Sequence, residues 1–249
     1  MEIYQAIILG AVQGVTEFLP ISSSGHLALI SALFNLQGDL LFSVVLHLAT
    51  LIPVVFVYRK ELISLLSDRK KLFYLVIATI PAGVVGLLFS SVVEEMFISV
   101  KMLSWSFFAT ALMLILCHFI KKDDKKIGLK QALIYGAFQA LAIFPGVSRS
   151  GSTLTAGKVA GVREEDNISF AFIMSVPIIL ASLFLESVKV ITCEKVLSVG
   201  VVPMVFGFLS ALISGFIFAL VMKKFAFKSN KFFSVYLIAL SCILLVWKI

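Results

Sequence analysis

The chain has 249 residues, of which 60% are hydrophobic and only 14% are charged, with a mean hydropathy of +1.08. Soluble domains average about half apolar and about a quarter charged residues, so this composition excludes an ordinary soluble domain and predicts an integral membrane protein. The formal net charge of +7 does not indicate a nucleic-acid partner. Most lysines and arginines lie in short stretches that bound apolar segments, as the positive-inside rule predicts for a membrane protein. These stretches are 59–71, 121–130, Arg163 and 223–231.

Along the chain, interrupted apolar segments alternate with continuous ones. Residues 2–35 are apolar but are broken near Pro20, and residues 130–162 are broken near Pro145. Three continuous segments follow each broken one, and each is long enough to supply the roughly 20 helical residues that cross a bilayer. The six predicted spans are 40–58, 72–92, 102–120, 167–187, 200–222 and 232–248.

Each broken segment is expected to form a re-entrant helical hairpin. Its arms have about 12–15 residues each, or roughly 20 Å of helix, which is too short to cross the hydrocarbon core. Such a hairpin is tolerated at membrane depth where protein or a wet cavity surrounds it. With hairpins at these two places, all four basic stretches fall on one face, the cytoplasmic face under the positive-inside rule. The first hairpin and both termini then lie outside, and the second hairpin enters from inside.

The two hairpin loops carry near-copies of one polar sequence, which predicts an internal duplication. Gln13 and Gln139 open the two copies, and their separation sets an offset of 126 residues. A single-residue gap then brings Pro20 and Pro145 into line. The loops are therefore interpreted as one functional element that occurs once in each half of the chain.

An odd number of spans between the copies makes the repeats inverted, over roughly 1–120 and 130–249. We therefore expect a single integral membrane domain over 1–249. Its fold would be an all-α polytopic membrane protein with an inverted-topology repeat, six full transmembrane helices and two re-entrant helical hairpins. At equivalent positions the copies hold Ser23 and Arg149. Because the copies carry different reactive groups, they predict one composite site in which the hairpin tips meet.

The first loop supplies a carboxylate followed by a run of small polar residues. Placing a carboxylate such as that of Glu17 at membrane depth costs free energy, so this residue indicates a functional site. Gln13 lies one helical turn before Glu17 on the same helix face and is its expected neighbour. Serine is a preferred N-cap, and the first amides of a helix bind anions. The run after Pro20 therefore predicts an anion site at a helix start. Its members are Ser22, Ser23, Ser24 and Gly25.

Of the three histidines in the chain, His26 is expected to act in the site. It lies one helical turn after Ser22, so its imidazole can share the same polar pocket. His47 and His118 lie inside predicted spans, without a polar loop beside them in the sequence. They are interpreted as packing residues, the commoner role of a lone histidine in a helix.

Arg149 is the clearest phosphate-binding signal in the chain. An arginine stays protonated when buried, and its planar fork suits phosphate oxygens. Ser148 and Ser150 flank it, and Gly151 permits close backbone approach. We therefore predict a second anion-binding helix start here. An ion pair with Glu17 inside the membrane is the alternative interpretation.

With these motifs the chain resembles the undecaprenyl pyrophosphate phosphatase family, also called bacitracin-resistance proteins. The matching elements are Gln13-x-x-x-Glu17, the run 22–26 and the motif 145–153. The resemblance covers essentially the whole chain. It implies an enzyme that removes the terminal phosphate from a C55 polyprenyl diphosphate, recycling the monophosphate carrier of cell-wall synthesis and conferring bacitracin resistance. Many members have a glutamate where this chain has Gln13, so weaker binding of a divalent cation is expected here.

The resemblance implies catalytic roles for Glu17, Ser23, His26 and Arg149. Glu17 would act as general base, or would hold Mg²⁺ or Ca²⁺ together with Gln13. Three nucleophiles are open, namely Ser23, His26 and an activated water. We favour Ser23, with His26 protonating or orienting the leaving phosphate. The implied phosphate-binding residues are Ser22, Ser24, Gly25, Ser148, Ser150, Gly151 and Thr153.

The expected partners are a polyprenyl diphosphate and membrane lipids, and a homodimer is compatible with the sequence. The expected location is the inner (plasma) membrane, with the site open to the outer, periplasmic face. A transporter or flippase of a polyprenyl phosphate is the alternative function, because it would use the same inverted hairpins without an acid–base pair. Glu17 and His26 favour an enzyme over a transporter, because they can act as an acid–base pair. Phosphate release by protein in detergent would separate the two functions, since transport needs a sealed membrane.

Overall fold

The structure is a computed structural model that describes residues 1–36, 39–120, 124–192, 199–225 and 230–246. Within these ranges the regular structure is helical, apart from one isolated bridge between Lys125 and Val162. The predicted all-α fold is therefore confirmed for these ranges. Parts of two basic stretches, residues 121–123 and 226–229, lie outside the described residues.

The helices follow one another with short connections. The first half of the chain contains α1 (Ile3–Thr16), α2 (Ser23–Leu33), α3 (Leu40–Val57), α4 (Arg59–Ser67), α5 (Arg69–Leu88), α6 (Ser90–Ile98) and α7 (Val100–Phe119). The second half contains α8 (Leu129–Leu141), α9 (Arg149–Val159), α10 (Glu164–Ile173), α11 (Ser175–Ile191), α12 (Val201–Phe225) and α13 (Asn230–Val246).

Five helical segments among the described residues are long and apolar enough to cross a membrane. They are α3, α5, α7, the consecutive pair α10–α11, and α12, and each overlaps one predicted span. The sixth predicted span, 232–248, overlaps α13, which has 17 residues and is a shorter apolar helix. Residues 247 and 248 of that span lie outside the described residues. Over the residues that the structure describes, the chain is thus an all-helical, polytopic membrane protein.

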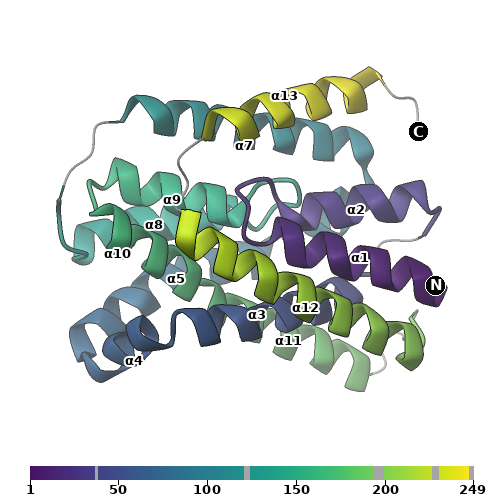
Figure 1. Cartoon of the computed structure of the whole chain (residues 1–249), viewed down its shortest axis with the longest axis horizontal. Coiled ribbons are helices and arrows are strands. Elements are labelled where there is room, and N and C mark those ends of the chain that lie inside the picture. Colours follow the sequence, from purple (N-terminus) through teal and green to yellow (C-terminus); the bar gives the residue numbers. More distant parts are fainter. Residues whose placement is uncertain (37–38, 121–123, 193–198, 226–229, 247–249) are drawn as a thin grey trace.

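The two interrupted segments fold as pairs of short helices. The arms α1, α2, α8 and α9 have 14, 11, 13 and 11 residues. The loop between α1 and α2 and the loop between α8 and α9 meet near the centre of the molecule (Figure 1). Ser150 Oγ in the second pair donates to the Leu19 carbonyl of the first loop over 3.0 Å. The polar loops of the two halves are therefore in contact, as a composite site requires.

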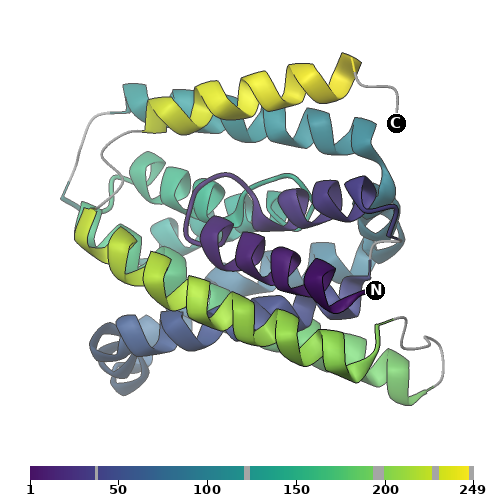
Figure 2. The same ribbon diagram turned by 45° about the vertical axis from the view of Figure 1, so that its right-hand side comes forward.

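The first arm of each short pair packs on a helix from the other half of the chain. α1 runs along α12, and α8 runs along α5, while α13 lies beside α7 in both views (Figures 1 and 2). Glycines allow the closest of these contacts, because a Cβ on Gly10 would overlap the Gly207 carbonyl and a Cβ on Gly14 would overlap Ser214. Small residues bring membrane helices together in this way. The packing ties the loop of each pair to the opposite half.

A buried polar clamp holds the second pair in place. Tyr135 of α8 donates to Asn167 Oδ1 of α10 over 2.7 Å, and Asn167 Nδ2 donates to the Leu154 carbonyl of α9 over 2.9 Å. Tyr135 is completely buried and Asn167 nearly so. Satisfied polar groups of this kind rigidify a low-dielectric interior. The hydrogen bonds of Asn167 therefore hold α9 in place against α8 and α10.

Candidate active site

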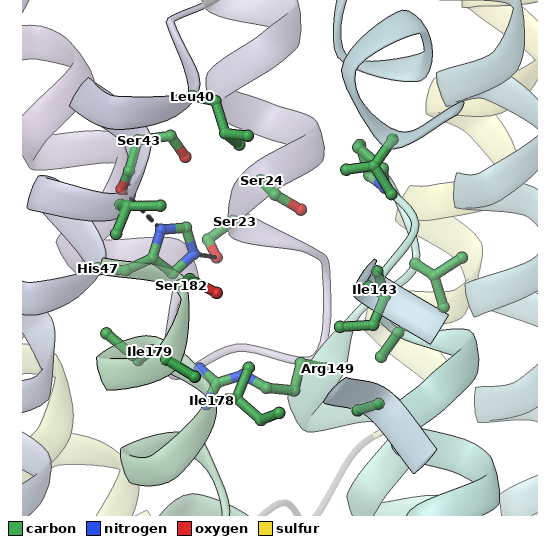
Figure 3. Close-up of a pocket in the computed structure, with 18 of the residues that line it drawn as sticks. Ser23, Ser24, Leu40, Ser43, His47, Ile143, Arg149, Ile178, Ile179 and Ser182 are labelled. Atoms are coloured by element: carbon green, nitrogen blue, oxygen red, sulfur yellow. Dashed lines mark hydrogen bonds between the residues drawn. The ribbon is translucent and has the colours of Figure 1, made fainter. Parts of the chain in front are cut away.

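A cavity of about 310 Å³ lies between the two loops and helices α3, α5, α6 and α11. Figure 3 shows Ser23, His47 and Arg149 converging on it from different elements. The wall formed by α5 and α11 is largely apolar, with Gly83 and Ile179 among its residues. A mostly apolar cavity with a few converging polar groups is the usual form of a small-molecule site.

Equivalent serines begin the two helices that point at the cavity. Ser22 is the N-cap of α2 and accepts from the Gly25 amide over 3.3 Å. Ser148 is the N-cap of α9 and accepts from the Gly151 amide over 3.1 Å. The predicted helix starts are therefore confirmed. Ser22 and Ser148 line the cavity, whereas Gly25 and Gly151 do not. The two glycines instead contribute their backbone amides to the caps.

Glu17 and Arg149 form an ion pair across the contact between the loops. The Glu17 side chain is 3% exposed and that of Arg149 is 18% exposed. The ion pair that the sequence left as an alternative is therefore present. It uses Nη2 of Arg149, and an arginine has five N–H donors, so the guanidinium keeps donors on its other nitrogens for an anion.

Ser23 shares the same carboxylate. Its Oγ donates to Glu17 Oε2 over 2.6 Å, the length of a charge-assisted hydrogen bond. Gln13 Nε2 donates to the same oxygen over 2.9 Å and lies 3.3 Å from Thr50 Oγ1. Glu17 is thus the centre of the polar cluster, with Ser23 facing the cavity.

The structure does not bring His26 to this cluster. Its Nδ1 donates to the Ser22 carbonyl over 2.7 Å, and its Nε2 accepts from the Tyr236 hydroxyl over 2.8 Å. The ring packs edge-on against Phe107 and does not line the cavity. Ser22 has a φ of 70°, a region that costs a non-glycine residue about 1–3 kcal/mol. The bond to His26 helps to hold this turn.

His47 occupies the place that was expected for His26. Its Nε2 lies 3.4 Å from Ser23 Oγ and 3.5 Å from Glu17 Oε2. Sequence reasoning assigned His47 to packing, although a signal was available. Ser43, His47 and Thr50 follow an i, i+4, i+7 spacing, which places three polar side chains on one face of an apolar helix. A polar stripe inside a membrane span indicates a functional face.

Thr110 of α7 supports the second loop. Its Oγ1 donates to the Gly146 carbonyl and accepts from the Ser148 amide, each over 3.0 Å. Thr110 is completely buried. Gly146 has a φ of +89°, and a Cβ there would lie 2.5 Å from Ser106 Cβ, so this turn requires glycine. The turn fixes where α9, and with it Arg149, begins.

The remaining predicted phosphate-binding residues divide into two groups. Ser24 and Ser150 line the cavity, and their hydroxyls lie 3.3 Å from those of Ser22 and Ser148 respectively. Thr153 instead donates to the Arg149 carbonyl over 2.9 Å within α9 and does not line the cavity.

The side chains at Glu17 do not fit a site for Mg²⁺ or Ca²⁺ as they are arranged. The part of the chain that the structure describes holds no group of three or more acidic, histidine or cysteine side chains around one point. Both oxygens of Glu17 accept from protein donors, and Gln13 turns its Nε2 toward them while its buried Oε1 has no hydrogen-bond partner. These cations need about six or more oxygen ligands.

Comparison with known proteins agrees with this geometry. The family model of the bacitracin resistance protein BacA matches residues 6–243. An undecaprenyl-diphosphatase of Thermosipho africanus is 40% identical over 248 residues, covering 95% of this chain and 97% of the relative. Proteins of the same name from Bacteroides thetaiotaomicron and Methanobrevibacter smithii are 39% and 38% identical, each covering 85% or more of both chains. With its paired loops, its Glu17–Arg149 ion pair and these relatives, the chain belongs to the bacitracin resistance protein family.

Proposed function

We propose that this protein is an undecaprenyl-diphosphatase, an enzyme that hydrolyses the terminal phosphate of a C55 polyprenyl diphosphate. The name of its relatives supports this substrate and reaction. The observation that carries the proposal is the contact of Ser23 with Glu17 beside Arg149 in one cavity. A hydroxyl held by a carboxylate next to a guanidinium combines a nucleophile with a phosphate-binding group.

Phosphate binding would fall to Arg149 and the two helix starts. The N-termini of α2 and α9 both lie at the cavity, as their N-caps Ser22 and Ser148 show. Helix N-termini and a guanidinium favour the charge that spreads over the phosphoryl oxygens in the transition state. Ser24 and Ser150 would add hydroxyl donors.

Ser23 is the nucleophile that we favour. Its Oγ would bond to the terminal phosphorus while the bond from that phosphorus to the bridging oxygen breaks, releasing the lipid monophosphate. Direct attack by His26 is disfavoured, because Ser22 and Tyr236 occupy both ring nitrogens. Protonation of the leaving phosphate by His26 is disfavoured as well, because the ring does not line the cavity. Attack by water that Glu17 activates is the remaining alternative.

Phosphate release from a polyprenyl diphosphate by purified protein in detergent tests this function. Wild-type protein should turn over, and Glu17→Ala should lose about a hundredfold or more in kcat/KM, because it removes the partner of both Ser23 and Arg149. Glu165→Ala, an exposed change at the start of α10, is the matched control and should leave turnover unchanged. A wild-type protein without phosphatase activity would contradict the proposal.

A lipid transporter is the second candidate. The first arm of each short pair packs on a helix of the other half, α1 on α12 and α8 on α5. This arrangement is compatible with inverted repeats, which are common in transporters. Activity in detergent separates the two functions. Transport alone requires a sealed membrane, so it would leave no phosphate release in detergent.

For the topology we propose six spans and two re-entrant hairpins, in the inner membrane, with both termini outside. The short arms and the exchanged packing of the two halves, roughly 1–120 and 130–249, support this arrangement. Labelling single cysteines in a cysteine-free background with an impermeant reagent tests it. Position 2 should react from outside, and position 60 should react only after the membrane is opened.

The divalent cation and the homodimer stay predictions. No step of the mechanism passes through a metal, because the side chains at Glu17 do not form a fitting ligand set. Turnover in the presence and absence of a chelator measures whether a cation is needed. Light scattering of the detergent-solubilised protein measures the oligomeric state.

A further inference from the structure

His47 lies at the reacting group although it belongs to neither loop. It is in the middle of α3, and Figure 3 shows its ring turned toward Ser23. Its Nε2 is 3.4 Å from Ser23 Oγ and 3.5 Å from Glu17 Oε2. The side chain is 19% exposed, and it lines the cavity. A basic nitrogen is therefore in reach of the hydroxyl that would attack the substrate.

Ser43 determines which ring nitrogen of His47 carries a proton. Nδ1 lies 2.8 Å from the Ser43 carbonyl oxygen, and a carbonyl can only accept. Nδ1 therefore carries a proton in the neutral and in the charged ring. In the neutral ring the basic lone pair is consequently on Nε2, the nitrogen that faces Ser23.

One hydroxyl proton can occupy two places in this cluster. Ser23 Oγ has a single proton and two partners: it donates to Glu17 Oε2 over 2.6 Å, and Nε2 of His47 lies 3.4 Å from it. After Ser23 loses the proton, a protonated Nε2 forms an ion pair with the same carboxylate oxygen at 3.5 Å. Glu17 Oε2 thus accepts a hydrogen bond from Ser23 before the transfer and faces the charged ring of His47 after it.

Glu17 is suited to hold negative charge while the ring takes the proton. Arg149 pairs with its Oε1, and Gln13 donates to its Oε2 over 2.9 Å. Donors on both oxygens favour a carboxylate that stays ionised. Neither the amide of Gln13 nor the guanidinium of Arg149 can accept the proton. A charged carboxylate beside an imidazole stabilises the imidazolium that forms during catalysis.

We propose that His47 is a catalytic residue that takes the hydroxyl proton of Ser23 during attack, with Glu17 stabilising the charged ring. This proposal rests on the proposed function with Ser23 as nucleophile. In the first step the Oγ–P bond forms, and the bond between that phosphorus and the bridging oxygen breaks. The lipid monophosphate leaves with the bridging oxygen and its electron pair, and the proton moves from Oγ to Nε2.

The second step returns the same proton. Water attacks the phosphoserine, its oxygen bonds to phosphorus, and the P–Oγ bond breaks. Nε2 of His47 gives its proton to Ser23 Oγ, and both water protons leave on the inorganic phosphate. The two side chains end in their starting states, and the reaction consumes only substrate and water.

His47→Gln separates proton acceptance from packing, because its amide can still accept a hydrogen bond but has no basic nitrogen. We expect kcat to fall about 10²–10⁴-fold, the usual contribution of acid–base catalysis. KM should change less than about threefold, since other groups bind the phosphate. His118→Gln, an exposed change on α7, should leave both constants unchanged. A normal kcat for His47→Gln, or a defect that disappears at high Mg²⁺, would overturn the proposal.

His47→Ala gives an independent readout. Added imidazole should restore part of its kcat, because imidazole supplies the missing basic nitrogen through the cavity, whereas Ser23→Ala should gain nothing. The unfolding temperature in detergent checks that His47→Ala is folded. A folded His47→Ala protein that does not respond to imidazole would count against proton acceptance.

Failure of the proposed function has a different outcome. In that case wild-type protein releases no phosphate, or the trapped phosphate label is found on a residue other than Ser23. Failure of the present proposal leaves wild-type turnover and the Ser23 label intact, while His47→Gln turns over normally. Label on Ser23 together with a slow His47→Gln enzyme supports both proposals.

Discussion

Glu17 and Arg149 stand 132 positions apart in the chain and meet as an ion pair where the two polar loops touch. Glu17 directly follows α1, which packs on α12 of the opposite half of the chain. Arg149 is the first residue of α9, whose partner arm α8 packs on α5 of the opposite half. The pair therefore exists only when both halves are correctly packed, and it links the integrity of the fold to the arrangement of the site.

Replacing Arg149 by lysine should cost at least about a hundredfold in kcat/KM, although the charge is kept. A lysine is a point charge that cannot hold Glu17 and a phosphate with one planar fork. Steady-state phosphate release measures the loss. Arg163→Lys, at an exposed arginine that pairs with Asp166 over 2.9 Å, is the control and should be normal. Near-normal turnover of Arg149→Lys would contradict bidentate phosphate binding.

Brief reaction with substrate labelled in its terminal phosphate, followed by acid quenching, should leave the label on Ser23. Ser23→Ala should trap none, because no other hydroxyl is held by Glu17 in the described cavity. Ser31→Ala, on the same helix but outside this cavity, should trap label as the wild type does. Peptide mapping by mass spectrometry locates the phosphate. Label on His26 would exclude the serine mechanism.

Thr110→Val should destabilise the protein by about 1–3 kcal/mol and lower turnover. The change leaves the Gly146 carbonyl and the Ser148 amide buried without their partner, and unsatisfied buried groups cost about this much. Thermal unfolding in detergent measures the loss. Thr79→Val is the matched control, since its hydroxyl bonds the Leu75 carbonyl within its own helix. Equal unfolding temperatures for the two variants would show that Thr110 does not support the loop.

Gly14→Ala should lower the unfolding temperature, because the added methyl overlaps Ser214 in the contact between α1 and α12. Overpacking of this kind costs about 1–3 kcal/mol. Gly83→Ala is the opposite case. A Cβ at Gly83 has no heavy atom within 4 Å, and alanine is favoured over glycine in a helix interior by about 0.5–1 kcal/mol. Unfolding curves of both variants should therefore move in opposite directions, and parallel shifts would argue against close packing at Gly14.

Local sequence patterns predicted much of the helical structure. Runs of apolar residues marked the long helices, and Ser22 and Ser148 marked the starts of α2 and α9, because an N-cap depends on residues within one turn. The break at Phe89, where α5 ends before the predicted span does and α6 begins, was missed. The apolar pattern continues through that turn, so hydropathy alone cannot show it.

The two histidines show where sequence reasoning was limited. His26 stands in the polar run and was expected at the site, yet its ring turns toward Tyr236 on α13. His47 stands in an apolar span, yet its ring turns toward Ser23. The position of His26 in the chain predicted that it lies near the polar loop. It did not predict which face of its helix meets the cavity.

The class of protein, the two polar loops and the chemistry that they can offer follow from the order of residues, because hydropathy, capping and residue type are local properties. The pairing of Glu17 with Arg149, the burial of His26 and the position of His47 at Ser23 follow only from the packed fold. These relationships depend on how α3, α9 and α13 pack around the loops, and packing between distant segments sets the directions of side chains that no local pattern contains.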